Sequence, residues 1–475
     1  MTSTQSLYPF QFHRLSANQV LIVSVTGDFT FLDQVSLELL INDPDSLSTS
    51  LQAELKSKFF WGTKGAGTLK LLASRVAAKK ELITSGPSLH IIVPTLQCEH
   101  TCHYCQVSRS LESSGFAMSP GQIDMACDTI FQSPSKSLTI EFQGGDPLLR
   151  FDLICRAIDR INLVNIKERR DVRFVITSTL HQLTKSMCDY FKKNNVYLST
   201  SIDGPASLHN LNRPIKNKNS FERTLEGISM ARKFIGEDSV SALMTTTKSS
   251  LQHPEEIVDE YVKLGFKEIC LRPLSLYGFA TRNQKTIGYS PQEYGEFYER
   301  AFNRILFWNK SGQQLQEASA SILLNKMLSP FDAGYVDLQS PTGAGLATIL
   351  YNYDGYIYPS DEARMLVESG DKSFRLGKIG DSFAEILNSS VMRNLVGESL
   401  VNYVPGCTDC AFKSYCGPDL IEAKGRFGSI TAPVLWTNHC KRHKWHFDFL
   451  FRKLKSGDEQ LVSLMHSWAK PKSLQ

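Results

Sequence analysis

The chain has 475 residues, of which 42% are hydrophobic and 21% charged, and its formal net charge is +4. This is the balance of a globular protein with about two to four domains. The charge is too small to indicate a nucleic-acid partner, and no apolar run reaches the roughly 18 residues of a membrane span. Residues 1–15 hold no apolar signal segment, so we expect a cytoplasmic protein. Eleven cysteines in a reducing compartment indicate metal binding rather than disulfide bonds.

The first 85 residues predict a small domain of strands and helices. The strand-like runs 20–25 and 29–32 flank Thr26-Gly27-Asp28 and predict a β-hairpin. Helical patterns follow at 33–40 and 48–58.

Residues 86–285 alternate between strand-like and helix-like segments. The expected strands are 89–95, 137–142, 172–177, 196–202, 240–245 and 268–271, and the expected helices are 119–132, 152–165, 183–194, 221–235 and 254–264. Short apolar strands alternating with helices predict a parallel sheet with right-handed crossovers, hence the α/β class. In barrels that are built from parallel strands and helices, the active site lies at the carboxyl ends of the strands.

A CxxxCxxC motif of Cys98, Cys102 and Cys105 follows the first of these strands. Three local thiolates can hold an iron–sulfur cluster and leave one iron without a protein ligand. The same cysteines could bind zinc with a distant fourth ligand, and His100 and His103 are also available. The first spacing is one residue too long for a paired CxxC zinc knuckle.

The cysteine spacing resembles that of the radical S-adenosylmethionine (SAM) enzymes. The resemblance implies a partial (βα)6 barrel, a [4Fe–4S] cluster on the three cysteines, and SAM bound to the open iron. One electron from such a cluster cleaves SAM to methionine and a 5′-deoxyadenosyl radical. Gln143-Gly144-Gly145-Asp146-Pro147 follows the second strand and resembles the family's GGE motif, with Asp146 in place of glutamate.

The resemblance also assigns residues that contact SAM. It places Gly144, Gly145 and Asp146 near the methionyl amine, and Ser178 at the end of the third strand. Ser201 and Asp203, in an SxDG-like segment, end the fourth strand. The remaining assignments are Tyr104 near the adenine and Arg213 near the carboxylate; a surface ion pair is the alternative for Arg213, as it is for Arg272 after the sixth strand.

A second cysteine set comprises Cys407, Cys410, Cys416 and Cys440. It resembles the C-terminal SPASM extension of radical SAM peptide maturases, which carries auxiliary [4Fe–4S] clusters. Ser360 and Leu420 stand where relatives place ligands of a further cluster, so we expect two clusters in total. Zinc on these four cysteines is the structural alternative.

Asp361 directly follows Ser360. In sulfatase-maturing relatives, an aspartate after the corresponding cysteine acts as a general base, so the resemblance gives Asp361 a possible catalytic role. The alternative is a turn carboxylate beside Glu362 and Arg364.

Almost the whole chain resembles the His-Xaa-Ser system radical SAM maturases, B type. The resemblance rests on segments such as Tyr8-Pro9-Phe10-Gln11-Phe12, Gly27-Asp28-Phe29, Ser88-Leu89-His90, Gln106-Val107-Ser108-Arg109, Glu141-Phe142-Gln143-Gly144-Gly145 and Tyr358-Pro359-Ser360-Asp361-Glu362-Ala363-Arg364. It implies a substrate protein with His-Xaa-Ser repeats, a second maturase of C type, and an electron donor such as flavodoxin or ferredoxin. No membrane or nucleic-acid partner is expected.

We therefore expect five regions: a winged-helix-like peptide-recognition extension (1–85), the barrel (86–285), a helical linker (286–345), a SPASM-like domain (346–450) and a tail (451–475). A packing extension of the barrel is the alternative for the first region. The expected function is hydrogen abstraction from a residue of a ribosomally made peptide. The rival hypotheses are a radical SAM enzyme acting on a small molecule or RNA, and a degenerate, metal-stabilised scaffold for a partner maturase.

Overall fold

The computed structural model describes residues 5–63, 65–112, 114–216 and 219–470. The chain divides into two compact units. The barrel unit comprises Ser85–Ser319 and Ala344–Asn394, and the second unit comprises Met1–Thr84, Ala320–Gly343 and Leu395–Gln475. No helix in this described part of the chain is long and apolar enough to cross a membrane.

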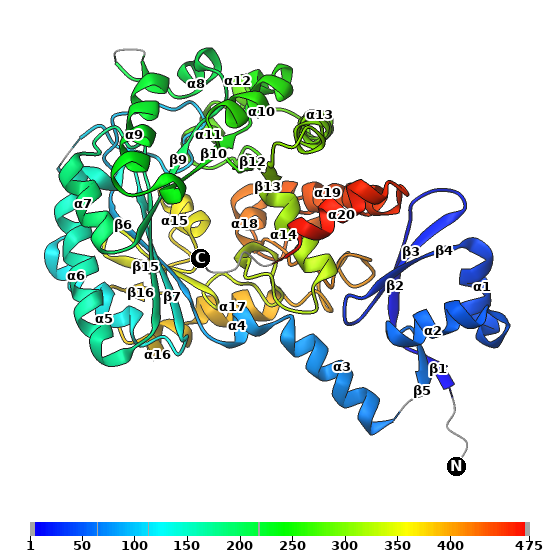
Figure 1. Ribbon diagram of the computed structural model, residues 1–475. Helices are drawn as coiled ribbons and strands as arrows, with labels where there is room; N and C mark the ends of the chain where they lie inside the picture. The colour runs from blue at the N-terminus through cyan, green and yellow to red at the C-terminus, as the bar shows by residue number, and fades with distance from the viewer. Residues whose placement is uncertain (1–4, 64, 113, 217–218, 471–475) are drawn as a thin grey trace. The chain divides into compact units, whose positions relative to one another are not determined.

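The barrel unit is built on a nine-stranded sheet in the order β12-β10-β9-β8-β7-β6-β14-β15-β16 (Figure 1). The strands are β6 (Leu89–Thr95), β7 (Ser137–Gly144), β8 (Asp171–Thr177), β9 (Val196–Ser201), β10 (Val240–Thr245), β12 (Leu271–Arg272), β14 (Thr348–Tyr351), β15 (Tyr356–Tyr358) and β16 (Gly377–Lys378). Neighbours from β12 to β14 are parallel. The expected parallel sheet, and with it the α/β class, is confirmed.

The sixth expected strand is divided in two. β11 (Glu268–Ile269) pairs with β13 (Gln316–Glu317), whereas β12 pairs with β10. The Glu317 carboxylate accepts a hydrogen bond of 3.2 Å from the backbone of Leu271, just past the break. The strand therefore changes partner at Cys270, which the apolar run did not indicate.

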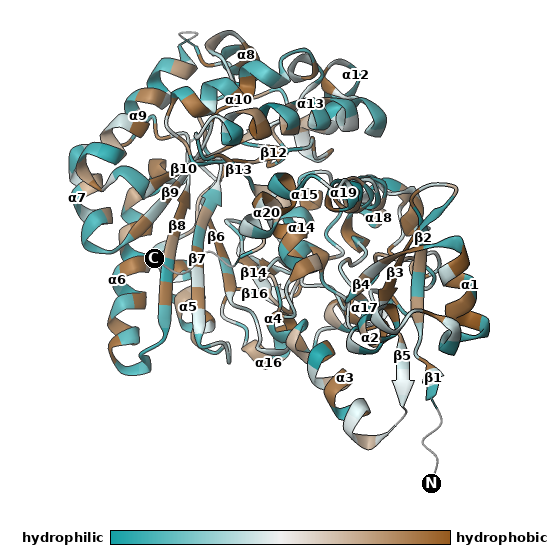
Figure 2. Cartoon of the chain, turned by 45° about the vertical axis from the view of Figure 1, so that its right-hand side comes forward, coloured by the Kyte–Doolittle hydropathy of each residue, from teal (hydrophilic) through white to brown (hydrophobic). Residues whose placement is uncertain are grey.

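Helices cover one face of this sheet. The five expected helices are present as α5 (Pro120–Ile130), α6 (Phe151–Glu168), α7 (Lys185–Lys193), α9 (Ser220–Phe234) and α10 (Pro254–Lys263). In α6 the buried residues Leu153, Ile154, Ala157, Ile158 and Ile161 form one apolar stripe at helical spacing. Figure 2 shows the same amphipathic colouring on α6 and α9. Further helices of the unit are α8 (Ala206–Asn212), α11 (Gly278–Arg282), α12 (Gln284–Ile287), α13 (Pro291–Lys310), α15 (Asp361–Val367) and α16 (Phe383–Leu387).

The other face of the sheet carries polar side chains. Along β7, Leu138, Ile140 and Phe142 are buried, while the alternate residues Glu141 and Gln143 are only partly buried. Successive side chains of a strand point to opposite faces. Figure 1 shows α5, α6 and α7 on one side of the sheet and α15 on the other. Glu141 and Gln143 therefore line the inner face of the barrel.

Strands β14 to β16 extend the sheet beyond its first strand. β14 lies parallel to β6, with Leu350 opposite Ile91, and is fully buried. β15 and β16 continue antiparallel. Residues 348–378, expected in a separate SPASM-like domain, thus form the edge of the barrel sheet, and they bring α15 to its inner face.

The N-terminal part of the second unit contains a three-stranded antiparallel sheet of β2 (Phe10–Arg14), β3 (Gln19–Ser24) and β4 (Phe29–Asp33). The β3–β4 pair confirms the expected hairpin. The expected helices are present as α1 (Gln34–Asn42) and α2 (Thr49–Ser57), and β1 (Gln5–Leu7) pairs with β5 (Trp61–Thr63). Val20 and Ile22 of β3, which is brown in Figure 2, form a core with Leu40 and Phe60.

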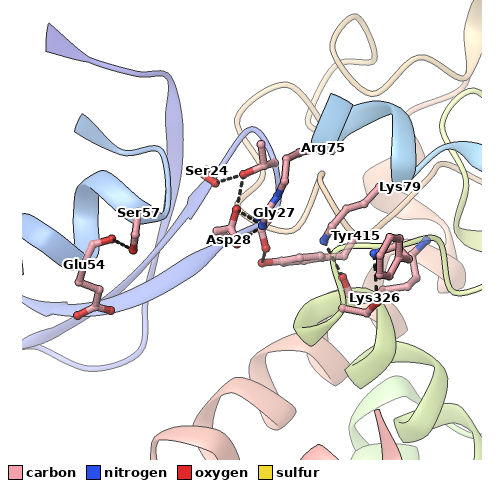
Figure 3. A network of polar contacts seen from close by, with 12 residues as sticks. Ser24, Gly27, Asp28, Glu54, Ser57, Arg75, Lys79, Lys326 and Tyr415 are labelled. Carbon is pink, nitrogen blue, oxygen red and sulfur yellow. Dashed lines mark hydrogen bonds and ion pairs between the residues drawn. The ribbon is translucent and has the colours of Figure 1, made fainter. Parts of the chain in front are cut away.

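The rest of the second unit is helical: α3 (Ala66–Ala78), α4 (Glu81–Thr84), α18 (Leu420–Phe427), α19 (Asn438–Lys455) and α20 (Glu459–Trp468), with parts of α14 (Ala318–Leu328) and α17 (Ser390–Glu398). Figure 3 shows its polar ties. The Tyr415 hydroxyl donates to Gly27 O at 2.8 Å, and Arg75 contacts Asp28 at 2.7 Å. Lys79 Nζ donates to Lys326 O at 3.1 Å. The first bond ties the N-terminal sheet to the cysteine-bearing C-terminal segment, and the other two tie the sheet to Arg75 of α3 and Lys79 to α14.

Candidate functional site

The CxxxCxxC loop begins directly after β6. Cys98 N donates to Ser110 O at 2.9 Å, and Cys105 O accepts from Phe279 N at 2.9 Å, so both ends of the loop are held by backbone bonds. Burial raises the pKa of the Cys98 thiol well above its usual range and that of Cys102 to about 11. The neighbouring Cys102 and Cys105 thiols raise the pKa of Cys98 further. The three sulfur atoms therefore lie within electrostatic reach of one another.

His100 lies in the loop but is engaged elsewhere. Its Nε2 is 2.9 Å from Ser220 Oγ, and its ring lies 4.5 Å from that of His181. Burial lowers the pKa of His100 far below its usual value. A buried neutral histidine bonded to a serine serves the packing of the loop, so His100 is not available as a ligand.

The Gly-Gly turn after β7 is in contact with the backbone of this loop. A Cβ at Gly144 would lie 2.2 Å from Thr95 O, and one at Gly145 would lie 2.2 Å from Leu96 O. Gly144 also has a φ of +140°, which L side chains rarely adopt. Backbone bonds from Gly145 N to Thr95 O (3.0 Å) and from Asp146 N to Gln97 O (2.7 Å) close the turn. The Gly-Gly motif and the cysteine motif therefore form one structural element.

Asp146 is almost fully buried and ties two strand ends together. Its carboxylate accepts from Ser178 Oγ at 2.7 Å and from the Thr179 hydroxyl and backbone N–H. It also caps the short turn that follows, by accepting from Leu148 N at 3.2 Å. Asp146 and Ser178 thus bond to each other. Their predicted contact with SAM stays a prediction, as does that of Ser201 at the end of β9.

Tyr104, Asp203 and Arg213 form one buried cluster. The Tyr104 hydroxyl donates to Asp203 at 2.8 Å, and Arg213 Nη1 donates to the Tyr104 oxygen at 2.7 Å. Burial raises the pKa of the Asp203 carboxyl, an effect that the Arg213 charge opposes. Burial also raises the pKa of Tyr104. Arg213 is therefore not a surface arginine: its charge is offset inside the barrel, electrostatically close to Cys102.

Asp361 and Arg364 belong to α15, whose first turn Ser360 caps by accepting from Ala363 N at 3.3 Å. Arg364 has no exposed surface, and its Nη1 donates to Val107 O, beyond the cysteine motif, at 3.0 Å. Its Nε and Nη2 have no hydrogen-bond partner among the residues described here. Asp361 is the charge that most favours this buried guanidinium, and Cys105 adds to it.

Sequence reasoning gave no role to Glu141, which lies on the inner face of β7. Its Oε1 accepts from Thr177 Oγ1 at 2.9 Å and from Gln143 Nε2 at 2.9 Å. Burial raises the pKa of Glu141, and nearby Asp361 raises it further. The alternation of apolar and polar residues along β7 was the only sequence signal that could have placed Glu141 on this face.

In the second unit, Cys407, Cys410, Cys416 and Cys440 all line one cavity of about 40 Å³. Burial, together with the neighbouring Cys440 and Cys410, raises the pKa of Cys407 to about 12. Leu420, where relatives place another cysteine, is a buried core residue at the start of α18. Four converging thiols around a cavity fit a cluster with four protein ligands.

Within the described stretches, no group of three or more His, Cys, Asp or Glu side chains stands close enough to hold a metal ion. A zinc ion requires its ligands at about 2.0–2.3 Å from one point, whereas each thiolate of a cubane binds a different iron atom.

Comparison with protein families identifies the barrel. Residues 92–266 match the Radical SAM superfamily. The barrel has the radical SAM fold. A match to this superfamily implies a [4Fe–4S] cluster and SAM, and the three thiols beside the Gly-Gly turn fit the cluster. Cys98, Cys102 and Cys105 would hold the cluster, which supplies the electron for SAM cleavage.

Individual relatives extend this likeness over most of the chain. A cysteine-type anaerobic sulfatase-maturating enzyme of Clostridium novyi (strain NT) is 22% identical over 337 residues, which cover 68% of this chain and 83% of the relative. Among solved structures, native anSMEcpe with bound AdoMet has a TM-score of 0.65 at 17% identity and covers 80% of this chain and 100% of its own. Streptococcus suis SuiB bound to precursor peptide SuiA has a TM-score of 0.53 at 13% identity, covering 90% and 98%. These structures confirm the radical SAM fold.

Proposed function

We propose that this protein is a radical SAM maturase that abstracts hydrogen from a residue of a ribosomally made peptide. The observation that carries the proposal is the three-thiol loop locked against the Gly-Gly turn at the end of β7, 2.7–3.0 Å between backbone atoms. The substrate class is supported by the relatives, one named for sulfatase maturation and one bound to a precursor peptide.

Different residues of the barrel have different proposed roles. Cys98, Cys102 and Cys105 hold the cluster. Backbone groups of Gly144 and Gly145, with Ser178, Ser201 and the Tyr104–Asp203–Arg213 cluster, surround SAM. Asp146 acts through Ser178 by fixing the ends of β7 and β8. Asp361, at the start of α15, is the candidate base.

The second cysteine set is proposed to hold one auxiliary [4Fe–4S] cluster, which accepts an electron or helps to hold the substrate. Support comes from the shared cavity of the four thiols. Ser360 and Leu420, which cannot supply thiolates, support a total of two clusters. Iron near eight atoms per chain is the expected result, and iron near twelve would contradict it.

The substrate is proposed to be a small protein with His-Xaa-Ser repeats, handled together with a C-type maturase and reduced through a flavodoxin or ferredoxin. The β2–β3–β4 sheet has two edge strands, β2 and β4, on which a leader peptide can add as a further strand. Co-expression with the candidate substrate protein, followed by mass spectrometry of that protein, tests the assignment. A mass change that requires Cys102 supports it, and an unmodified substrate contradicts it.

A further inference from the structure

Glu141 is held in one orientation at the inner face of the barrel. Thr177 from β8 and Gln143 from β7 both donate to its Oε1, each at 2.9 Å. No hydrogen bond to its Oε2 is present among the described residues. The carboxylate is thus anchored through one oxygen and offers the other, an arrangement that suits contact with a substrate group.

Charged groups from two further elements face this carboxylate: Asp361 from α15 and Arg272 from β12. The inner face between β7 and α15 therefore presents the unbonded oxygen of Glu141 within electrostatic reach of the Asp361 carboxylate.

We propose that Glu141 is a second catalytic carboxylate, which acts with Asp361 on the substrate group bound between β7 and α15. The inference rests on the proposed function and adds a residue to it. The substrate group would carry a donor for Glu141 Oε2, such as a hydroxyl, a thiol or an amide N–H.

Glu141 is proposed to accept a proton during oxidation of the substrate. The deoxyadenosyl radical takes one hydrogen atom from a substrate carbon that bears an O–H, N–H or S–H group, and becomes 5′-deoxyadenosine. The remaining heteroatom proton would pass to Glu141 Oε2, and an iron–sulfur cluster held by the cysteines would accept the one electron. The carbon–heteroatom single bond becomes a double bond. The raised pKa of Glu141 makes it a better proton acceptor near neutral pH.

If Glu141 had a purely structural role, its replacement should lower the melting temperature. The proposed role predicts a rise. The folded protein holds the Glu141 proton more tightly than the unfolded chain, so ionising this carboxyl costs stability as pH rises above its unfolded value. Glu141→Gln keeps an oxygen for Thr177 and removes that cost. We therefore expect the variant to melt at a higher temperature than wild type at pH 8, with a smaller difference at pH 5.

The test compares wild type, Glu141→Gln and the control Glu226→Gln as reconstituted holoenzymes. Glu226 is exposed on α9. The assays measure 5′-deoxyadenosine release without peptide, conversion of a synthetic peptide with His-Xaa-Ser repeats across pH, and melting temperature. Glu141→Gln should keep 5′-deoxyadenosine release within about twofold of wild type. It should lose peptide conversion by about 10²-fold or more, together with the wild-type rise in rate with pH.

The two proposals fail in different ways. If wild type releases no 5′-deoxyadenosine, the proposed function fails. If wild type converts the peptide and Glu141→Gln converts it equally fast with the same pH profile, only the role of Glu141 fails. If wild type cleaves SAM but leaves this peptide unchanged, the melting temperatures decide: a Glu141→Gln protein less stable than wild type at pH 8 overturns the inference. In every case Glu226→Gln should match wild type.

Discussion

The contact between the Gly-Gly turn and the cysteine loop makes Gly145→Ala the sharpest test of the site. The added Cβ would lie 2.2 Å from Leu96 O and 2.3 Å from Gln97 O, while contacts under 3.0 Å essentially never occur. Both atoms belong to backbone that leads into Cys98, so the cysteine loop itself must move. Gly145 does not have a left-handed φ. The effect of the substitution is therefore one of space alone.

Forced overpacking of this kind costs about 1–3 kcal/mol. For a domain of this size the corresponding fall in melting temperature is about 2–5 °C. SAM binding should suffer more, because the loop carries the cluster ligands and the turn carries the predicted contacts with the methionyl amine. We expect SAM affinity of the reconstituted protein to fall about tenfold or more, which is about 1.4 kcal/mol.

The assays are thermal unfolding and titration of the reduced cluster with SAM, followed by its spectrum. Gly121→Ala is the matched control, since no atom lies within 4 Å of its added Cβ and Gly121 is in helix α5. That change should leave SAM binding unaltered and raise stability by about 0.5–1 kcal/mol. A Gly145→Ala protein with wild-type melting temperature and SAM affinity would refute the reasoning.

Three further predictions follow from the described contacts. Tyr104→Phe removes the hydroxyl that links Arg213 to Asp203 and should cost about 1–3 kcal/mol of unfolding free energy, measured by denaturant titration; an unchanged midpoint would contradict the buried cluster. Cys416→Ala should lose about four of about eight iron atoms per chain while SAM cleavage by the barrel persists, and retention of all iron would remove Cys416 from the ligand set. Burial lowers the pKa of Lys79 to about 8, so its charge destabilises the fold below that pH, and the unfolding free energy should rise between pH 8 and pH 10; a Lys79→Met protein with the same rise would exclude Lys79 as its source.

The sequence predicted the parts of the fold that depend on local pattern. Strands β6 to β10, the four expected helices between them and α10 agree with the expected segments because apolar periodicity and caps are local signals. The pairing of β14 with β6 was not predictable, since it joins residues more than 250 positions apart and depends on which buried edge is free. The same pairing brings α15 to the inner face, so the surroundings of Asp361 could not be predicted from the sequence either.

The functional site was likewise predictable from the sequence only where the signal is local. Spacing alone was enough to predict Cys98, Cys102 and Cys105 as cluster ligands, because cluster ligation imposes it. Spacing could not show that Asp146 bonds to Ser178 and Thr179, or that Tyr104 links Asp203 to Arg213. Glu141 escaped notice because a glutamate within a strand has no motif of its own. Its significance rests on the burial and charges around it, which only the assembled barrel reveals.

The central claim is that the three-cysteine loop supports reductive cleavage of SAM. Its most direct test is anaerobic reconstitution of the full chain with iron and sulfide, followed by dithionite and SAM, with 5′-deoxyadenosine measured by chromatography. The account predicts that wild type releases 5′-deoxyadenosine and that Cys102→Ala releases none, although its four C-terminal cysteines remain. Release by Cys102→Ala at the wild-type rate, or no release by a wild type that has bound its iron, would contradict it.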